Sequence, residues 1–323
     1  MFDTIAQREI GPYVVHELIG WGGMARVYRA TDTARGDSEV AIKVLSDSII
    51  GDPEYRQRFV REIEIASMLN HPYILPVLDF GCDSGLDMDL LFMVMPFVKG
   101  GTLAEVLRPH GPLTPQQTLY IAEQMGAALD YAHSFEIVHR DVKPANIMVI
   151  DDDTYSLADF GLVKRVDDWA EVTSGNVLGS PMYMSPEQAR GDQLDHRSDL
   201  YSMGLVLYEC LTGRLPYNPR SLVETLGSHI TAPPITPRQI SPSFPADLEV
   251  PMLHAIEKNM NDRFQSGQEI AAGFRAAVAE LSHKDRNRPL VTRMEIEGSR
   301  HLTQQPATRI IVGDFSPIDH LAA

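Results

Sequence analysis

The 323-residue sequence is poor in cysteine and in positive charge. Its two cysteines, Cys82 and Cys210, are too few for a disulfide framework, so we expect reduced thiols and a cytoplasmic location. The 28 Lys and Arg are outnumbered by 44 Asp and Glu, which gives a formal net charge of −16. A surface that follows nucleic-acid phosphates needs a basic excess, so this charge argues against nucleic acid as a partner.

Long apolar runs are also missing. No stretch of about 18 apolar residues is present that could span a bilayer. The first residues, MFDTIAQREIGPY, lack the basic-then-apolar layout of a secretion signal. We therefore expect no membrane segment in this chain, while a membrane tether beyond Ala323 in a longer parent protein stays open.

The hydrophobic pattern predicts a strand-rich part followed by a larger helical part. β-branched runs separated by turn residues predict strands, the first three as an antiparallel meander, at 13–20, 25–33, 38–46, 74–81 and 90–97. Helical spacing of apolar residues predicts one helix in the first part, at 54–69, and further helices at 115–135, 197–213 and 268–281. The polar segment that follows has no sustained period, and we expect a tail that is disordered in part.

Three glycines, Gly20, Gly22 and Gly23, stand between the first two predicted strands. Such a loop lets backbone N–H groups approach phosphate oxygens, although a hairpin also uses glycine simply for positive φ. A dinucleotide-binding loop is excluded by context, because that motif needs a helix next and a strand follows here.

Lys43 in the third strand points to the same side as Ala41, and Glu62 on the predicted helix could hold its ammonium by an ion pair.

Four polar residues are embedded between apolar runs in IVHRDVKPANIMV and YSLADFGL: Asp141, Lys143, Asn146 and Asp159. The oxygens of Asn146 and Asp159 could hold Mg²⁺ against a triphosphate, because hard cations prefer oxygen ligands. Asp141 would then be free to accept a hydroxyl proton. A polar turn with a buried aspartate is the alternative, and it explains the pattern less well once the upstream lysine and glycines are included.

With these motifs in this order and spacing, the chain resembles the eukaryotic-type serine/threonine protein kinases, in particular their bacterial branch. The resemblance covers residues 11–281 and implies an α+β fold of two lobes. Residues 11–98 would form a small antiparallel sheet lobe with one main helix, and residues 99–281 a larger, mainly helical lobe. Residues 282–323 would be the polar tail.

The resemblance also implies the roles of the site residues, with ATP and Mg²⁺ as cofactors and Mn²⁺ as an alternative. Asp141 would be the catalytic base, Lys143 would neutralise charge on the transferred phosphoryl group, and Asn146 and Asp159 would bind the metal. ATP would be held by the residues Ile19, Gly20, Gly22, Gly23, Val27, Ala41, Lys43, Glu62, Met95, Pro96, Val98 and Met148. The partners implied are proteins with Ser or Thr acceptors, and a homodimer is one way to autophosphorylate in trans.

An activation segment is implied from Asp159 to Glu187, with Ser180 helping to align the acceptor hydroxyl. Glu187 is expected to pair with Arg263, and Asp199 to bind the backbone of the catalytic loop, although an ordinary acidic residue at a helix N-terminus explains Asp199 equally well.

The resemblance also bears on regulation. Arg140 is expected to be a buried or half-buried cation that needs an anion. A phosphate on Thr173, Ser174 or both could supply it, and so could the acidic run VDDWAE.

Two other functions stay open. A binding-only pseudokinase usually lacks the lysine, the base or a metal ligand, and all of these are present here. A small-molecule phosphotransferase could share the fold, since a fold does not fix a function. LGSPMYMSPEQARG argues against it, because this stretch resembles the platform on which protein kinases seat a peptide.

Overall fold

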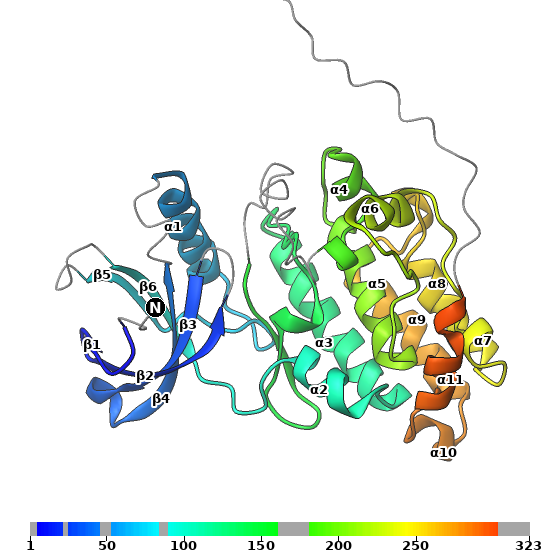
Figure 1. The fold of residues 1–323 in the computed structure, drawn as a ribbon, viewed down its shortest axis with the longest axis horizontal. Coiled ribbons are helices and arrows are strands. Elements are labelled where there is room, and N and C mark those ends of the chain that lie inside the picture. Colours follow the sequence, from blue (N-terminus) through cyan, green and yellow to red (C-terminus); the bar gives the residue numbers. More distant parts are fainter. Residues whose placement is uncertain (1–4, 22–24, 46–52, 84–89, 161–180, 303–323) are drawn as a thin grey trace, which may run out of the picture.

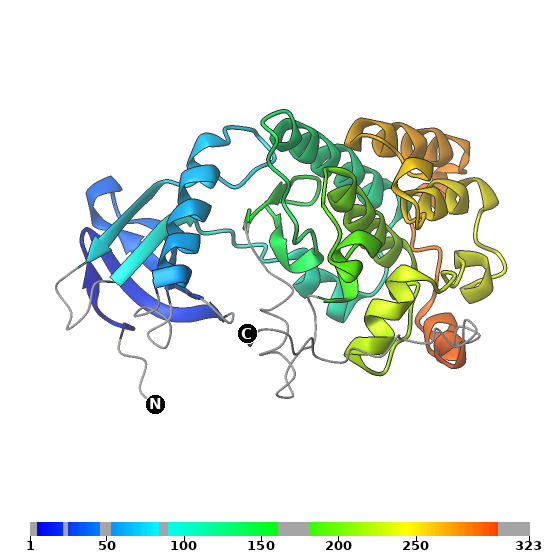
Figure 2. The ribbon, with the colours of Figure 1, turned by 90° about the horizontal axis from the view of Figure 1, so that it is seen from above.

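The structure is a computed structural model, and it describes residues 5–21, 25–45, 53–83, 90–160 and 181–302. Within these ranges a sheet lobe and a helical lobe lie side by side, as Figures 1 and 2 show. Each lobe has its own cluster of buried apolar residues. The predicted two-lobed α+β fold is confirmed.

The sheet of the small lobe is antiparallel, with the strand order β1-β2-β3-β4-β6-β5. Its strands are β1 (Glu9–Ile10), β2 (Tyr13–Trp21), β3 (Ala25–Asp32), β4 (Ser38–Leu45), β5 (Asp79–Asp83) and β6 (Leu90–Pro96). Tyr28, Ile42 and Val94, which pair across β3, β4 and β6, are fully buried and form one row of the core. Helix α1 (Pro53–Met68) adds Phe59 and Ile63 to the same core.

One predicted strand, 74–81, is wrong in its position. Strand β5 begins only at Asp79, and Ile74 forms no more than an isolated bridge with Leu157 of the other lobe. Pro76 stands inside the predicted strand, and proline lacks the N–H that a sheet ladder needs.

The helical lobe is built around α3 (Pro115–His133) and α5 (Arg197–Thr212), both largely buried. Two short strands, β7 (Ile147–Val149) and β8 (Tyr155–Leu157), form a hairpin beside them. The other elements are η1 (Thr33–Arg35), α2 (Leu103–His110), η2 (Pro144–Asn146), η5 (Pro181–Tyr183), α4 (Pro186–Arg190), α6 (Leu222–Ile230), α7 (Pro237–Ile240), α8 (Ala246–Ala255), η6 (Met260–Asp262), α9 (Gly267–Glu280), α10 (His283–Arg286), α11 (Arg293–Gly298) and η7 (Ser299–His301).

Helix α9 starts directly against α3. A Cβ atom on Gly126 would lie 2.6 Å from the carbonyl oxygen of Gly267, so only glycine permits this approach. Asp130 of α3 accepts hydrogen bonds from the backbone N–H groups of Gly267 and Gln268, at 2.7 and 2.8 Å. One carboxylate thus satisfies two of the N–H groups that the start of a helix leaves unpaired.

Part of the segment predicted as a polar tail is folded against the helical lobe. Helices α10 and α11 lie within it, Val291 is buried, and Arg214 donates to the backbone and side-chain oxygens of Ser299. Ile296 covers Gly213, where an added Cβ would lie 2.6 Å from its side chain. So few apolar anchors in a polar stretch leave no period to detect. Residues 303–323 lie outside the described part of the chain.

Among the helices in the described ranges, none combines the length and the apolar character that crossing a bilayer would require.

Candidate active site

The residues predicted to form a site come together where the two lobes meet. Lys43 lies on β4 of the sheet lobe, and Asp159 follows β8 of the helical lobe. The Lys43 ammonium donates a hydrogen bond of 2.9 Å to Oδ1 of Asp159. This ion pair joins residues 116 positions apart in the sequence and connects the two lobes at the site.

The loop of residues 137–146, here called the catalytic loop, is fixed from below by one buried carboxylate. Asp199 in the first turn of α5 accepts hydrogen bonds from the backbone N–H groups of His139 and Arg140, at 2.7 and 2.8 Å. Its side chain is 1 % exposed. Arg140 has a φ of +67°, a left-handed conformation that costs energy in a non-glycine residue. Both interpretations of Asp199 are therefore confirmed: it is an acidic residue in the first turn of a helix, and it binds the backbone of the catalytic loop.

His139 connects the catalytic loop to the segment before Asp159. Its Nε2 lies 3.1 Å from the backbone oxygen of Ala158, and its Nδ1 accepts the backbone N–H of Asp141 at 3.3 Å. Burial lowers the pKa of this fully buried imidazole, which favours the neutral form. A neutral ring protonated on Nε2 satisfies both contacts at once.

Asp141, Lys143 and Asn146 form one hydrogen-bonded cluster at the end of this loop. The Lys143 ammonium lies 2.7 Å from Oδ2 of Asp141. The Asn146 amide nitrogen donates to the same oxygen at 3.2 Å and to the backbone oxygen of Asp141 at 2.8 Å. The carboxylate of Asp141 is thereby held in one orientation, with a cation beside it.

Asp159 carries a second ionised carboxylate beside this cluster. Its φ of +59° is again left-handed. Although burial opposes ionisation, the nearby Lys43 ammonium and its hydrogen bond hold the pKa of Asp159 below its ordinary value, while Asp141 works in the opposite direction. The charges of Asp141 and Lys143 are thus close enough to act on Asp159, and the site contains two carboxylates and two ammonium groups.

The residues predicted to surround the adenine lie on neighbouring strands. Val27 pairs with Lys43 across β3 and β4, and Ala41 pairs with Met95 across β4 and β6. The positions of the remaining residues follow from the same sheet and from the β7–β8 hairpin: Gly20 pairs with Val27, Pro96 ends β6, Val98 follows it, Met148 lies on β7 and bridges to Thr102, and Ile19 is 42 % exposed on β2.

Several predicted residues lie outside the described part of the chain. These are Gly22 and Gly23 of the glycine loop, the side chain of Glu62, and Thr173, Ser174 and Ser180 of the activation segment. The expected pair between Lys43 and Glu62 stays a prediction for this reason.

The prediction for Arg140 is wrong in one respect, because its side chain is exposed rather than buried or half-buried. Its backbone makes the structural contacts instead, through Asp199 and through Gln188, whose side chain donates to the Arg140 oxygen at 2.9 Å. An exposed guanidinium is solvated and does not require an anion for stability.

The end of the predicted activation segment is held against the helical lobe by contacts of Tyr183 that the sequence did not predict. Tyr183 donates a short hydrogen bond to Glu209 of α5, and Ser202 donates to the Tyr183 backbone oxygen at 2.7 Å. Burial raises the pKa of the Glu209 carboxyl. The only sequence signal was the position of Tyr183 within SPMYMSPE, because the partner residues are far apart in the chain.

The expected pair between Glu187 and Arg263 is present and buried. Two guanidinium nitrogens lie 2.8 Å from the two carboxylate oxygens, and the side chains are 0 % and 2 % exposed for Arg263 and Glu187. Arg263 also donates to three backbone oxygens, and Ser198 donates to Glu187 at 2.7 Å. Despite burial, which opposes ionisation, these donors keep the pKa of Glu187 below its ordinary value.

Comparison with known proteins agrees with this geometry. The protein kinase domain family matches residues 13–285, and the chain belongs to this family. Similar proteins include the serine/threonine-protein kinase PknB of Mycobacterium leprae, which is 40 % identical over 261 residues, covering 80 % of this chain and 42 % of PknB.

Two further relatives are of the same kind. PknE of Mycobacterium tuberculosis is 36 % identical over 288 residues, covering 89 % of this chain and 50 % of PknE. PrkC of Bacillus subtilis is 38 % identical over 273 residues, covering 84 % of this chain and 41 % of PrkC. Both are named serine/threonine-protein kinases, and the chain spans at most about half the length of these relatives.

Breaking the buried pair should destabilise the protein strongly. Arg263→Ala leaves the Glu187 carboxylate buried without its cation, and we expect a loss of about 3 kcal/mol or more in the free energy of unfolding, measured in urea. The matched control is Arg275→Ala, which removes the exposed pair with Glu123 and should cost less than about 1 kcal/mol. Equal stability of the two variants would contradict this assignment.

Proposed function

We propose that the chain is an ATP-dependent serine/threonine protein kinase that transfers the γ-phosphate of ATP to hydroxyl groups of proteins. The observation that carries the proposal is the meeting of Asp141, Lys143, Asn146 and Asp159 with Lys43 from the other lobe. Membership of the protein kinase family and the names of the relatives support it.

The polar groups fit a nucleotide and a divalent metal. Asp159 and Asn146 offer oxygen ligands of the kind that Mg²⁺ prefers, and within the described ranges no residue donates a hydrogen bond to the side-chain oxygen of Asn146. We propose these two residues as the metal ligands, with Mn²⁺ as an alternative ion. When bound, the metal neutralises charge on the phosphates.

The protein side of the transfer follows from the described contacts. Asp141 would accept the proton of the substrate hydroxyl, and Lys143 beside it would stabilise charge on the transferred group. Lys43 would exchange part of its contact with Asp159 for the phosphates. Because such a reaction demands little covalent chemistry, the main contribution of the protein is to hold these groups in place.

The alternative functions are less well supported. A pseudokinase usually lacks the lysine, the base or a metal ligand, and Lys43, Asp141, Asn146 and Asp159 are all present in this chain. For a small-molecule phosphotransferase, the segment from Pro181 to Arg190 would have no purpose, yet it is folded and fixed by the Glu187–Arg263 pair.

We propose a cytoplasmic location, because two cysteines are too few for the disulfide framework of a protein from an oxidising compartment.

Asp141 and Lys43 should have separable effects. We expect Asp141→Asn to bind ATP normally but to slow transfer by roughly 10²- to 10⁴-fold, as typical for loss of a general base. Lys43→Met should also suppress transfer through poorer alignment of the phosphates. Transfer to a serine peptide is measured by mass spectrometry with ATP and Mg²⁺, and nucleotide binding by calorimetry.

The matched control is Asp152→Asn, which changes an exposed carboxylate in the turn between β7 and β8. It should leave the rate unchanged. If Asp141→Asn turns over as fast as this control, Asp141 is not the base. If Lys43→Met is fully active, the nucleotide is held elsewhere.

We further propose that the kinase phosphorylates itself at Thr173, Ser174 or both, with a homodimer as one way to do so in trans. The exposed Arg140 could then bind the phosphate by charge-assisted hydrogen bonds and order the segment, although its own stability does not depend on an anion. The double variant Thr173→Ala/Ser174→Ala should be less active toward a peptide. Full activity, with no phosphate found on this segment of the parent protein, would refute the proposal.

A further inference from the structure

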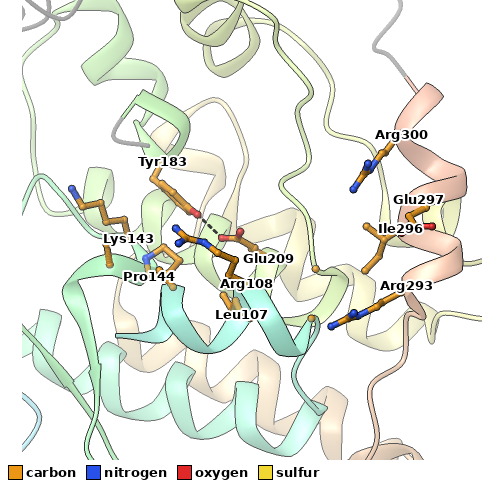
Figure 3. A pocket seen from close by; sticks show the side chains of 14 residues that line it. Leu107, Arg108, Lys143, Pro144, Tyr183, Glu209, Arg293, Ile296, Glu297 and Arg300 are labelled. Atoms are coloured by element: carbon orange, nitrogen blue, oxygen red, sulfur yellow. Dashed lines mark hydrogen bonds between the residues drawn. The ribbon is translucent and has the colours of Figure 1, made fainter. Parts of the chain in front are cut away.

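A pocket of about 620 Å³ lies on the helical lobe next to the catalytic loop (Figure 3). We call it the α2–α11 pocket, because α2 and the catalytic loop line one side and α11 with η7 the other. Its volume is within the usual range for ligand sites. Apart from Lys143, none of the residues that line it belongs to the site for ATP and the acceptor hydroxyl.

Positive charge dominates this pocket. Its lining contains three arginines, Arg108, Arg293 and Arg300, and also Lys143, whose ammonium is paired with Asp141. Figure 3 shows Arg293 and Arg300 reaching from α11 and η7 toward Arg108 on the opposite side. The chain as a whole has a formal net charge of −16, so three arginines around one cavity are an exception to its acidic composition.

The carboxylates of the lining do not cancel these cations. Glu209 is half-buried, and its carboxylate already accepts the Tyr183 hydroxyl. Glu297 is the other carboxylate of the lining and is exposed. Within the described ranges, Arg108, Arg293 and Arg300 form no ion pair, whereas several exposed arginines elsewhere do.

The two sides of the pocket are held in position. On α2, Thr102 and Glu105 form a capping box at the helix start. On the other side, Ile296 packs over Gly213, and Arg214 binds Ser299 directly before Arg300. A site whose helices are already in position loses less free energy on binding than one whose backbone must be ordered by its ligand.

We propose that the α2–α11 pocket binds an acidic side chain of the protein substrate, a carboxylate or a phosphorylated residue, while the acceptor hydroxyl of the same substrate lies at Asp141. The proposal rests on the kinase function proposed above and names its substrate class. Lys143 provides the connection, because it lines the pocket and also lies 2.7 Å from Oδ2 of Asp141. A peptide that leaves the pocket past Lys143 therefore reaches the predicted base directly.

The test compares peptides that share one serine. The parent peptide is neutral. Its relatives carry Asp, Glu, phosphoserine or Lys about three to six residues before or after the serine, because an extended chain of that length spans roughly 10–20 Å. We expect the wild type to prefer an acidic relative by about fivefold or more in kcat/KM, mainly through a lower KM and less so at high salt. The Asp and phosphoserine arms distinguish carboxylate from phosphate.

The variant Arg108→Gln/Arg300→Gln should reduce this preference to less than about twofold and leave kcat for the neutral peptide unchanged. The matched control is Arg8→Gln/Lys284→Gln, which removes two exposed cations that do not line the pocket, one just before β1 and one on α10. This variant should retain the preference. A charge reversal, Arg108→Glu/Arg300→Glu, should transfer the preference to the Lys peptides.

Three results would overturn the inference: a wild type without preference, a preference for Lys peptides that Glu209→Gln abolishes, and an acidic preference that survives in the double Gln variant. Binding of a fluorescent acidic peptide without serine, followed by anisotropy, tests the pocket independently of catalysis. If no peptide is phosphorylated, the kinase proposal fails, and loss of this binding in Arg108→Gln/Arg300→Gln still decides whether the pocket binds anions.

Discussion

The carboxylate of Asp199 is the contact on which the rest of the site depends. It is buried in the helical lobe, and it accepts two backbone N–H groups of the catalytic loop and lies 2.8 Å from Nε2 of His133. Hydrogen bonds to a buried charge are stronger than those between neutral groups. They allow the loop to adopt the left-handed conformation at Arg140, after which Asp141 follows at once.

From this fixed point the site extends outward in two directions. Toward the sheet lobe, His139 bonds to Ala158, Asp159 follows, and Lys43 reaches across to it. Toward the substrate side, Gln188 binds the Arg140 backbone, and α4 is held by the Glu187–Arg263 pair. Among the described residues, Asp141, Lys143, Asn146 and Asp159 are therefore positioned by contacts of the helical lobe, and Lys43 comes from the other lobe.

The sequence predicted the local elements well, because each strand or helix with one buried face repeats its apolar residues at the corresponding period. It also predicted the Glu187–Arg263 pair and the contact of Asp199, but only through a resemblance, since their partners are 76 and 60 positions away. Composition and spacing contain no information on such distances. Three features near the surface were not predicted: the exposure of Arg140, the start of β5, and the packing of α11 that forms one side of the α2–α11 pocket.

Asp199→Asn tests most directly whether Asp199 holds the catalytic loop in the geometry that the transfer needs. An asparagine of the same shape can accept one of the two N–H groups but not both, so the loop should shift and kcat should fall by about 10²-fold while ATP still binds. The control is Asp195→Asn, in the half-buried pair with Arg197 at the start of the same helix, which should keep its rate. A folded Asp199→Asn protein with the kcat of the wild type would contradict the account.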